Sequence, residues 1–131
     1  MNLLIDTHTF LWFVEGADEL SDTAKNYILD DKNKIYISIV SLWEISIKNS
    51  LGKLDIGGEY ATVINDVTDN DIEIMPISFQ HTMIQNKLPF HHKDPFDRLI
   101  IAQGIAEQIN IISKDSIFDD YLHKQSIKRI W

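Results

Sequence analysis

The chain has 131 residues, 44% of them hydrophobic, no cysteine, and a formal net charge of −8 at pH 7. This length suits one domain spanning residues 1–131, and the acidic balance argues against a protein that grips nucleic acid through a general basic surface. No apolar run approaches the roughly 20 residues of a membrane span, no signal peptide opens the chain and no disulfide can form, so we expect a cytoplasmic protein.

Short apolar runs alternate with helical patterns along the whole chain. We expect strands at residues 2–6, 34–38, 72–75, 110–113 and 127–131. We expect helices at residues 9–16, 21–30, 41–50, 59–69, 78–86 and 116–122, with one more from residue 94 onward. Strands that alternate with helices predict an α/β sandwich around a central, mostly parallel sheet.

Residues 91–104 turn abruptly from a loop into a helix. Asp94 suits the N-cap, and Pro95 suits the first helical position because its missing N–H has no intrahelical partner there. Asp97 then falls on the first turn, where the helix dipole stabilises a negative charge, and an apolar run begins at Leu99. A carboxylate at the start of a buried helix is well placed for chemistry at a cleft.

Four acidic residues fall where a parallel sheet would gather them. Ligands bind beyond the carboxyl ends of such strands, and converging carboxylates repel one another unless cations neutralise them. Oxygen ligands of this kind suit Mg²⁺ or Mn²⁺, which can activate a water molecule against a phosphodiester. The four are Asp6 at the end of the first strand, Glu44 in the helix after the second, Asp97, and Asp115 after the fourth strand.

Each of these acids also has a purely structural interpretation, which the sequence alone leaves open. Asp6 at a strand end can accept a backbone N–H of the next helix, and Asp115 can be a turn residue. Glu44 stands three residues after Ser41, which is the spacing of a capping box, and Asp97 has the same spacing from the cap before it. The four together are harder to explain structurally, because all of them fall at one end of the sheet.

The other polar candidates carry less weight. Histidines in loops are more often solvated than bound to metal, and scattered lysines are more often plain surface than an RNA-binding rim. Arg98 contacts either an RNA phosphate or a neighbouring acid, and the sequence does not separate the two. The remaining candidates are His8, His91 and His92; Lys48, Lys53, Lys87 and Lys93; and Asp119 and Asp120, which either add metal ligands or form a polar helix end.

Four segments spread over the chain form a recognisable pattern. They are LIDTH at residues 4–8 (with LW at 11–12), SIVSLWEI at 38–45, HHKDPFDRLIIAQ at 91–103 and ISKD at 112–115. Together they resemble PIN-domain proteins, and within these the VapC-like ribonuclease toxins of bacterial type II toxin–antitoxin pairs. The third segment is long and specific, whereas the others are weak on their own.

The resemblance implies a three-layer α/β/α fold, commonly paired as a homodimer. It implies a metal-dependent endoribonuclease in which Mg²⁺ or Mn²⁺ is held by the quartet Asp6, Glu44, Asp97 and Asp115. It further implies an RNA substrate and a small antitoxin protein that blocks the site. Gly104 departs from the longer alanine series typical of the family, and we interpret it as close packing of the helix, without effect on the chemistry.

Two other functions fit part of the pattern. An aspartyl-phosphate phosphoryl-transfer domain would use Asp6 as its nucleophile with Lys114 nearby, but it leaves Glu44 and Asp97 without a role. A non-catalytic module that binds RNA or protein would keep the fold, but a dead copy is expected to have lost one of the acids. We therefore predict a nuclease, in which Asp94 caps the helix and Asp97 holds metal.

Overall fold

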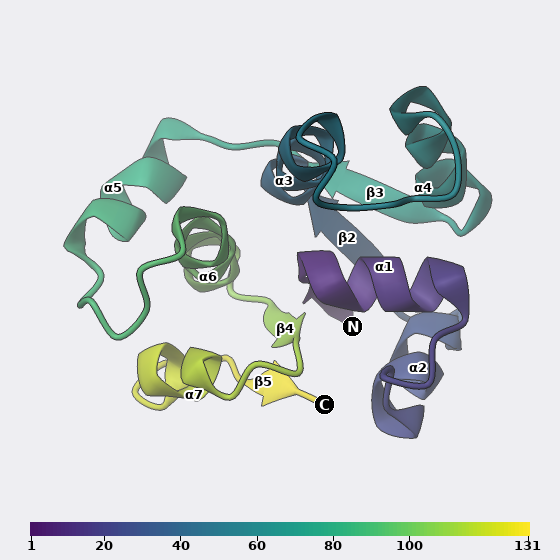
Figure 1. Cartoon of the computed structure of the whole chain (residues 1–131). Coiled ribbons are helices and arrows are strands. Elements are labelled where there is room, and N and C mark those ends of the chain that lie inside the picture. Colours follow the sequence, from purple (N-terminus) through teal and green to yellow (C-terminus); the bar gives the residue numbers. More distant parts are fainter.

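The computed structural model describes residues 1–131 and contains five parallel strands in the order β3-β2-β1-β4-β5 (Figure 1). The central strand β1 (Asn2–Ile5) pairs with β2 (Lys34–Ser38) on one side and β4 (Asn110–Ile112) on the other. The edge strands are β3 (Ile72–Met75) and β5 (Arg129–Ile130). The strand order reverses between β1 and β4, which is where open parallel sheets bind their ligands.

Helices cover both faces of this sheet, so the predicted three-layer α/β/α fold is confirmed (Figure 1). One face carries α1 (Thr7–Glu15), α2 (Asp22–Leu29) and α4 (Val63–Asp69), the last preceded by a 3₁₀ turn at Tyr60–Thr62. The other face carries α6 (Pro95–Glu107) and α7 (Ile117–Leu122). Two helices complete the fold: α3 (Ile39–Ser50), which contacts both α1 and α6, and α5 (Phe79–Lys87), which packs on α6. None of these helices is both long and apolar enough to cross a membrane.

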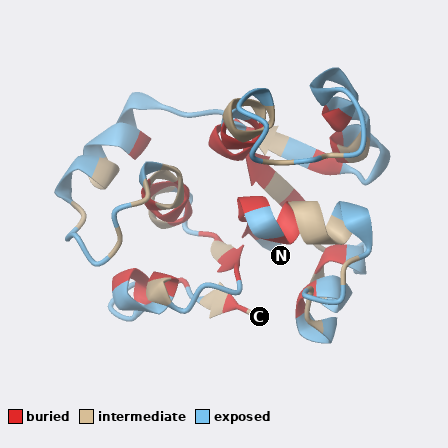
Figure 2. Cartoon of the chain, viewed as in Figure 1, coloured by how far each residue is buried: buried red, intermediate tan, exposed pale blue.

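The core consists of two apolar clusters, one on each side of the sheet, and burial is concentrated in the strands and the inner sides of the helices (Figure 2). In β1, Leu3 and Ile5 belong to one cluster and Leu4 to the other. Successive side chains of a strand point to opposite faces, and here both faces are covered. A strand of this kind is apolar at every position, which is why β1 was predicted from an unbroken apolar run.

Polar caps set the starts of α1 and α3, which both differ from the prediction, and α4 begins at Val63 rather than at residue 59 because a 3₁₀ turn precedes it. The Asp6 carboxylate accepts the Thr9 N–H, so α1 begins at Thr7, two residues earlier than expected. Ser38 accepts the Val40 N–H and caps α3, which therefore begins at Ile39. The capping-box interpretation of Glu44 is wrong, because Ser41 lies inside the helix.

Gly104 lies where α6 crosses β4, and the expected close packing is confirmed. A β-carbon built on Gly104 would lie 2.6 Å from Ile111 Cδ1, 2.9 Å from Ile111 Cγ1 and 3.3 Å from the Ile109 carbonyl oxygen. Real β-carbon contacts are longer, so a larger residue would displace the buried Ile111 side chain. Glycine allows the helix to approach the strand this closely.

We expect Gly104→Ala to lower the free energy of unfolding by about 1–2 kcal/mol, even after the gain in helix propensity, because the methyl group overpacks the contact with Ile111. Urea denaturation measures this change. In an Ile111→Val background, which removes the closest carbon, the loss should shrink. Gly58→Ala is the matched control, since its β-carbon would meet only Thr62 Oγ1 at 3.8 Å. Equal stability of Gly104→Ala and the wild type would contradict the packing argument.

Candidate active site

Asp6 is buried at the carboxyl end of β1, at the switch point of the sheet. Its Oδ1 accepts the Thr9 N–H at 2.9 Å, and its Oδ2 accepts the Ser113 hydroxyl at 2.6 Å. The structural interpretation of Asp6 as a helix cap is therefore correct. It does not exclude a metal, because a hydrogen-bonded carboxylate oxygen keeps a second lone pair.

Glu44 is buried on α3, and two partners occupy its carboxylate. The Thr7 hydroxyl donates to Oε1 at 2.7 Å and also lies 2.9 Å from Ser41 Oγ. The Lys48 ammonium, one helical turn further on, donates to Oε2 at 2.6 Å. Since Thr7 directly follows Asp6, this network brings Glu44 to the same corner of the sheet.

Asp97 lies on the first turn of α6, in the third helical position as predicted. Asp94 is the cap: its Oδ1 accepts the N–H groups of Phe96 and Asp97, at 2.8 and 3.1 Å. Asp97 does not close a capping box, because its Oδ2 instead pairs with His92 Nε2 at 2.8 Å. Ligand atoms of His92, Asp94 and Asp97 all lie within 4.8 Å of one another, a spacing that a metal ion can bridge.

Asp115 is attached to the same corner, but its carboxylate is exposed. Its backbone N–H donates to Ser113 Oγ at 3.1 Å, and Ser113 in turn donates to Asp6. The side chain accepts the Ile117 N–H at 3.0 Å, so the turn interpretation of Asp115 is correct. Thr7 thus joins Glu44 to the residue next to Asp6, and the charge of Asp6 reaches Asp97. The group whose ligand atoms lie within 4.8 Å of one another is that of His92, Asp94 and Asp97, and the exposed Asp115 is not part of it.

Burial and mutual repulsion destabilise the negative charges in this group. Burial raises the pKa of Asp6, and the hydrogen bonds from Ser113 and Thr9 only partly oppose that effect. The pKa of Asp97 rises to about 6, chiefly through burial and also through the charges of Asp94 and Asp6, while the bond to His92 lowers it. The effect of Asp6 on Asp97 means that two elements far apart in the chain share one electrostatic site.

These residues fit a divalent cation. Asp6, Glu44 and Asp97 supply carboxylate oxygens, the ligands that Mg²⁺ and Mn²⁺ prefer. Asp6 has no ion-pair partner, and burial raises its pKa, so its ionised form is only partly stabilised by the protein. A divalent cation would supply compensating positive charge.

Arg98 contacts neither an acid nor the surface, so both of its predicted roles are wrong. It is only 2% exposed, and its guanidinium donates to the carbonyl oxygens of Gln85, Leu88 and Pro89, at 3.1, 3.1 and 2.8 Å. These carbonyls end α5 and begin the loop that carries His92. Arg98 therefore holds this loop against α6, where a cation also complements the negative end of the α5 dipole.

The remaining candidates have various outcomes. His92 is not simply solvated, since it pairs with Asp97, whereas His8 is exposed. Asp119 forms a bidentate ion pair with Arg129, with both nitrogen–oxygen distances at 3.0 Å.

Three residues that contact the candidate acids are not predicted as site residues from the sequence. Thr7 and Ser113 are missed, and Lys48 is interpreted as plain surface. The spacing of Glu44 and Lys48, four residues apart on one helix, is the signal that identifies that pair.

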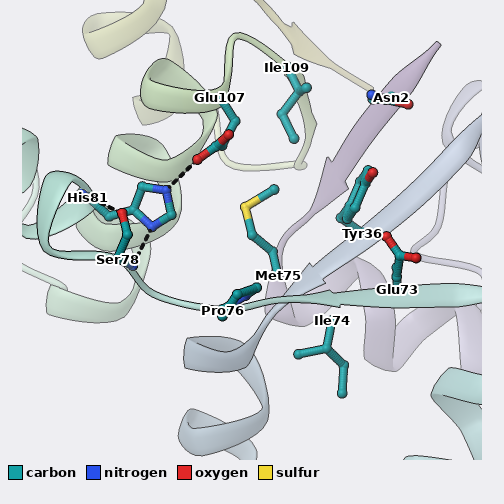
Figure 3. Close-up of a pocket in the computed structure, with 10 residues that line it drawn as sticks. All are labelled: Asn2, Tyr36, Glu73, Ile74, Met75, Pro76, Ser78, His81, Glu107 and Ile109. Carbon is teal, nitrogen blue, oxygen red and sulfur yellow. Dashed lines mark hydrogen bonds and ion pairs between the residues drawn. The ribbon is translucent and has the colours of Figure 1, made fainter.

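A separate pocket of about 400 Å³ lies beside β2 and β3, next to the start of α5 (Figure 3). In it, His81 Nε2 lies 2.8 Å from Glu107 Oε1, and the Ser78 N–H donates to His81 Nδ1 at 3.0 Å. Because Nδ1 accepts, Nε2 carries the hydrogen and donates to Glu107. None of the four predicted acids lines this pocket, and its histidine is engaged in joining α5 to α6.

We expect Asp97→Asn to raise the free energy of unfolding in EDTA at pH 7.5 by about 1–3 kcal/mol. The pKa of Asp97 is about 6 in the folded chain and near 3.8 when unfolded. Ionisation therefore costs stability as the pH rises from about 4 to 6, and the full cost is present above pH 6. Urea denaturation at several pH values should show the variant's advantage shrinking toward pH 4. The control is Asp22→Asn, at the exposed start of α2. If Asp97→Asn gained no more unfolding free energy than this control, the account would be wrong.

Comparison with solved structures finds related folds over essentially the whole chain. VapBC2 from Rickettsia felis bound to a promoter DNA fragment matches with a TM-score of 0.71 and 17% identity, covering 100% of each chain. VapBC-5 from Mycobacterium tuberculosis, a toxin–antitoxin system, matches with a TM-score of 0.67 and 15% identity, covering 98% of this chain and 96% of the other. The PIN domain endonuclease Utp24 matches with a TM-score of 0.56 and 16% identity, covering 98% and 90%. At such identities the likeness shows a shared fold.

The comparison with curated proteins finds no match. The sequence profile of the PIN domain, however, matches residues 3–123, which is nearly the full chain. This span runs from β1 to the residue after α7 and contains Asp6, Glu44, Asp97 and Asp115. The chain therefore belongs to the PIN domain family.

Proposed function

We propose that this protein is a metal-dependent endoribonuclease that acts as the toxin of a toxin–antitoxin pair. The observation that supports the proposal is the group of metal-binding side chains His92, Asp94 and Asp97, whose ligand atoms lie within 4.8 Å of one another, together with the buried Asp6 at the switch point of the sheet, whose charge acts on Asp97. Membership of the PIN domain family supports the same reading. The reaction is hydrolysis of an RNA phosphodiester by in-line attack of water.

Asp6 and Asp97 are the residues that we expect to hold Mg²⁺ or Mn²⁺, with Glu44 beside them and Asp115 at the rim. The bound cation supplies an activated water and neutralises charge that builds up on the phosphate. The chain's own groups keep the carboxylates in place: Ser113 orients Asp6, Thr7 orients Glu44, and His92 orients Asp97.

Protein partners are part of this proposal. The neighbours from Rickettsia felis and Mycobacterium tuberculosis are VapBC assemblies, the latter described as a toxin–antitoxin system. Next to Glu44, the Trp43 side chain is 58% exposed and borders an apolar groove of about 250 Å³ with Pro95, Phe96 and Leu99. Exposed apolar groups beside an acidic site suit a surface that another protein covers. We propose an antitoxin and a second copy of the chain as those partners.

The phosphoryl-transfer alternative finds less support. It requires a lysine close to the Asp6 carboxylate, but the Lys114 ammonium lies 5.6 Å from the centre of the Trp12 ring and forms no ion pair with Asp6. The alternative also leaves the nearby Glu44 and Asp97 unused.

We expect Asp6→Asn and Asp97→Asn each to lower RNA cleavage in Mg²⁺ or Mn²⁺ by at least about a hundredfold, because a carboxylate ligand becomes a neutral amide. Cleavage of labelled single-stranded RNA and of bulk tRNA measures this loss, and EDTA should abolish wild-type activity. Asparagine at position 6 still caps a helix, so circular dichroism should show an intact fold.

The control is Asp22→Asn, which removes an exposed acid outside the site and should cleave as the wild type does. Expression of the wild type without a partner should arrest bacterial growth, and Asp6→Asn should not. Full cleavage by Asp6→Asn, or wild-type cleavage that persists in EDTA, would overturn the proposed chemistry.

A further inference from the structure

We call Asp6, Glu44, Asp94 and Asp97 the acidic site. Lys48 is the one lysine that forms an ion pair with one of these residues. Its ammonium lies 2.6 Å from Glu44 Oε2, and the Glu44 side chain is only 3% exposed. The other Glu44 oxygen accepts the Thr7 hydroxyl, so both oxygens are engaged by the protein itself. This pair is therefore not an ordinary surface salt bridge, because one of its two charges is fully inside the protein.

The Lys48 ammonium also interacts electrostatically with other residues of the acidic site. Besides the hydrogen bond to Glu44, which is the main cause, the charges of Asp94 and Asp97 raise the pKa of Lys48. One lysine on α3 is thus coupled to acids on α3 and at the start of α6. It lies where a cation is attracted by several carboxylates at once.

The charges can be counted. Asp6, Glu44, Asp94 and Asp97 bring four negative charges to this corner when all are ionised, and Lys48 brings one positive charge. One divalent cation together with Lys48 leaves a net charge of −1, against −4 for the carboxylates alone, so most of their mutual repulsion is relieved. A second divalent cation at Glu44 would have to displace the Lys48 ammonium, which lies 2.6 Å from Oε2, or the Thr7 hydroxyl on Oε1.

We propose that the Lys48 ammonium is a built-in cation of the acidic site that takes the place of a second metal ion, so that the site holds a single divalent cation. This inference rests on the proposed metal-dependent function and deepens it. Lys48 acts as a positioning residue: it holds Glu44 and competes electrostatically with divalent cations for the carboxylates. It is not placed among the groups that touch the reacting atoms.

Titration of the full chain with MnCl₂ in a calorimeter, without RNA, tests the proposal. The wild type should bind one Mn²⁺ per chain. Lys48→Met should bind its first Mn²⁺ roughly tenfold more tightly, because a competing positive charge has been removed from beside Glu44. Lys48→Arg keeps the charge and should bind as the wild type does. Thermal unfolding followed by circular dichroism checks that the variants fold, which the 41% exposed Lys48 side chain favours.

The matched control is Lys34→Met, which removes a lysine from the exposed pair with Glu73, at 3.2 Å, outside the acidic site. It should leave Mn²⁺ binding unchanged. Two Mn²⁺ ions in the wild type, or unchanged or weaker binding by Lys48→Met, would overturn the role of Lys48 and leave the nuclease proposal standing. Absence of any Mn²⁺ binding by the wild type would instead overturn the metal site itself, and the inference with it.

Discussion

A buried negative charge at the end of the central strand ties the fold to the site. Asp6 accepts a backbone N–H that starts α1 and a hydroxyl that follows β4, so a single carboxylate joins two elements of the fold. Burial makes its charge unfavourable, as the raised pKa records. This unfavourable burial of charge occurs at the carboxyl end of the central strand, where open parallel sheets bind their ligands. A residue that only capped a helix would not need a buried charge at that position.

The sequence predicts most of the fold, because buried parallel strands and capped helices leave direct marks in the chain. All five strands lie within the predicted ranges or one residue from them. The start of α3 is harder to predict, because Ser38 and Ser41 are both serines and serine is a favourable N-cap residue. Ser41 instead lies within hydrogen-bonding distance of Thr7, a residue 34 positions away, and no local pattern encodes such a contact.

Parts of the candidate site can also be predicted. Acids at strand ends and helix starts can be found from the sequence, and the predicted capping role of Asp94 is confirmed, whereas the predicted metal-binding role of Asp97 stays a prediction. Arg98 was misjudged because its partners are carbonyl groups of a loop, which have no signature in side-chain identity. The partner of His92 was missed because a loop conformation, fixed by Arg98, turns its ring toward α6.

The position of β1 also bears on the order in which the site can form during synthesis. β1 precedes the other strands in the chain, yet it needs β4 as a neighbour, and the bond between Asp6 and Ser113 spans 107 positions of the chain. Contacts this distant in sequence form late, because the intervening chain must be closed first. A chain synthesised only as far as α6 lacks the Ser113 hydroxyl that Asp6 accepts. The complete hydrogen bonding of Asp6 therefore forms only after β4 and Ser113 have been added.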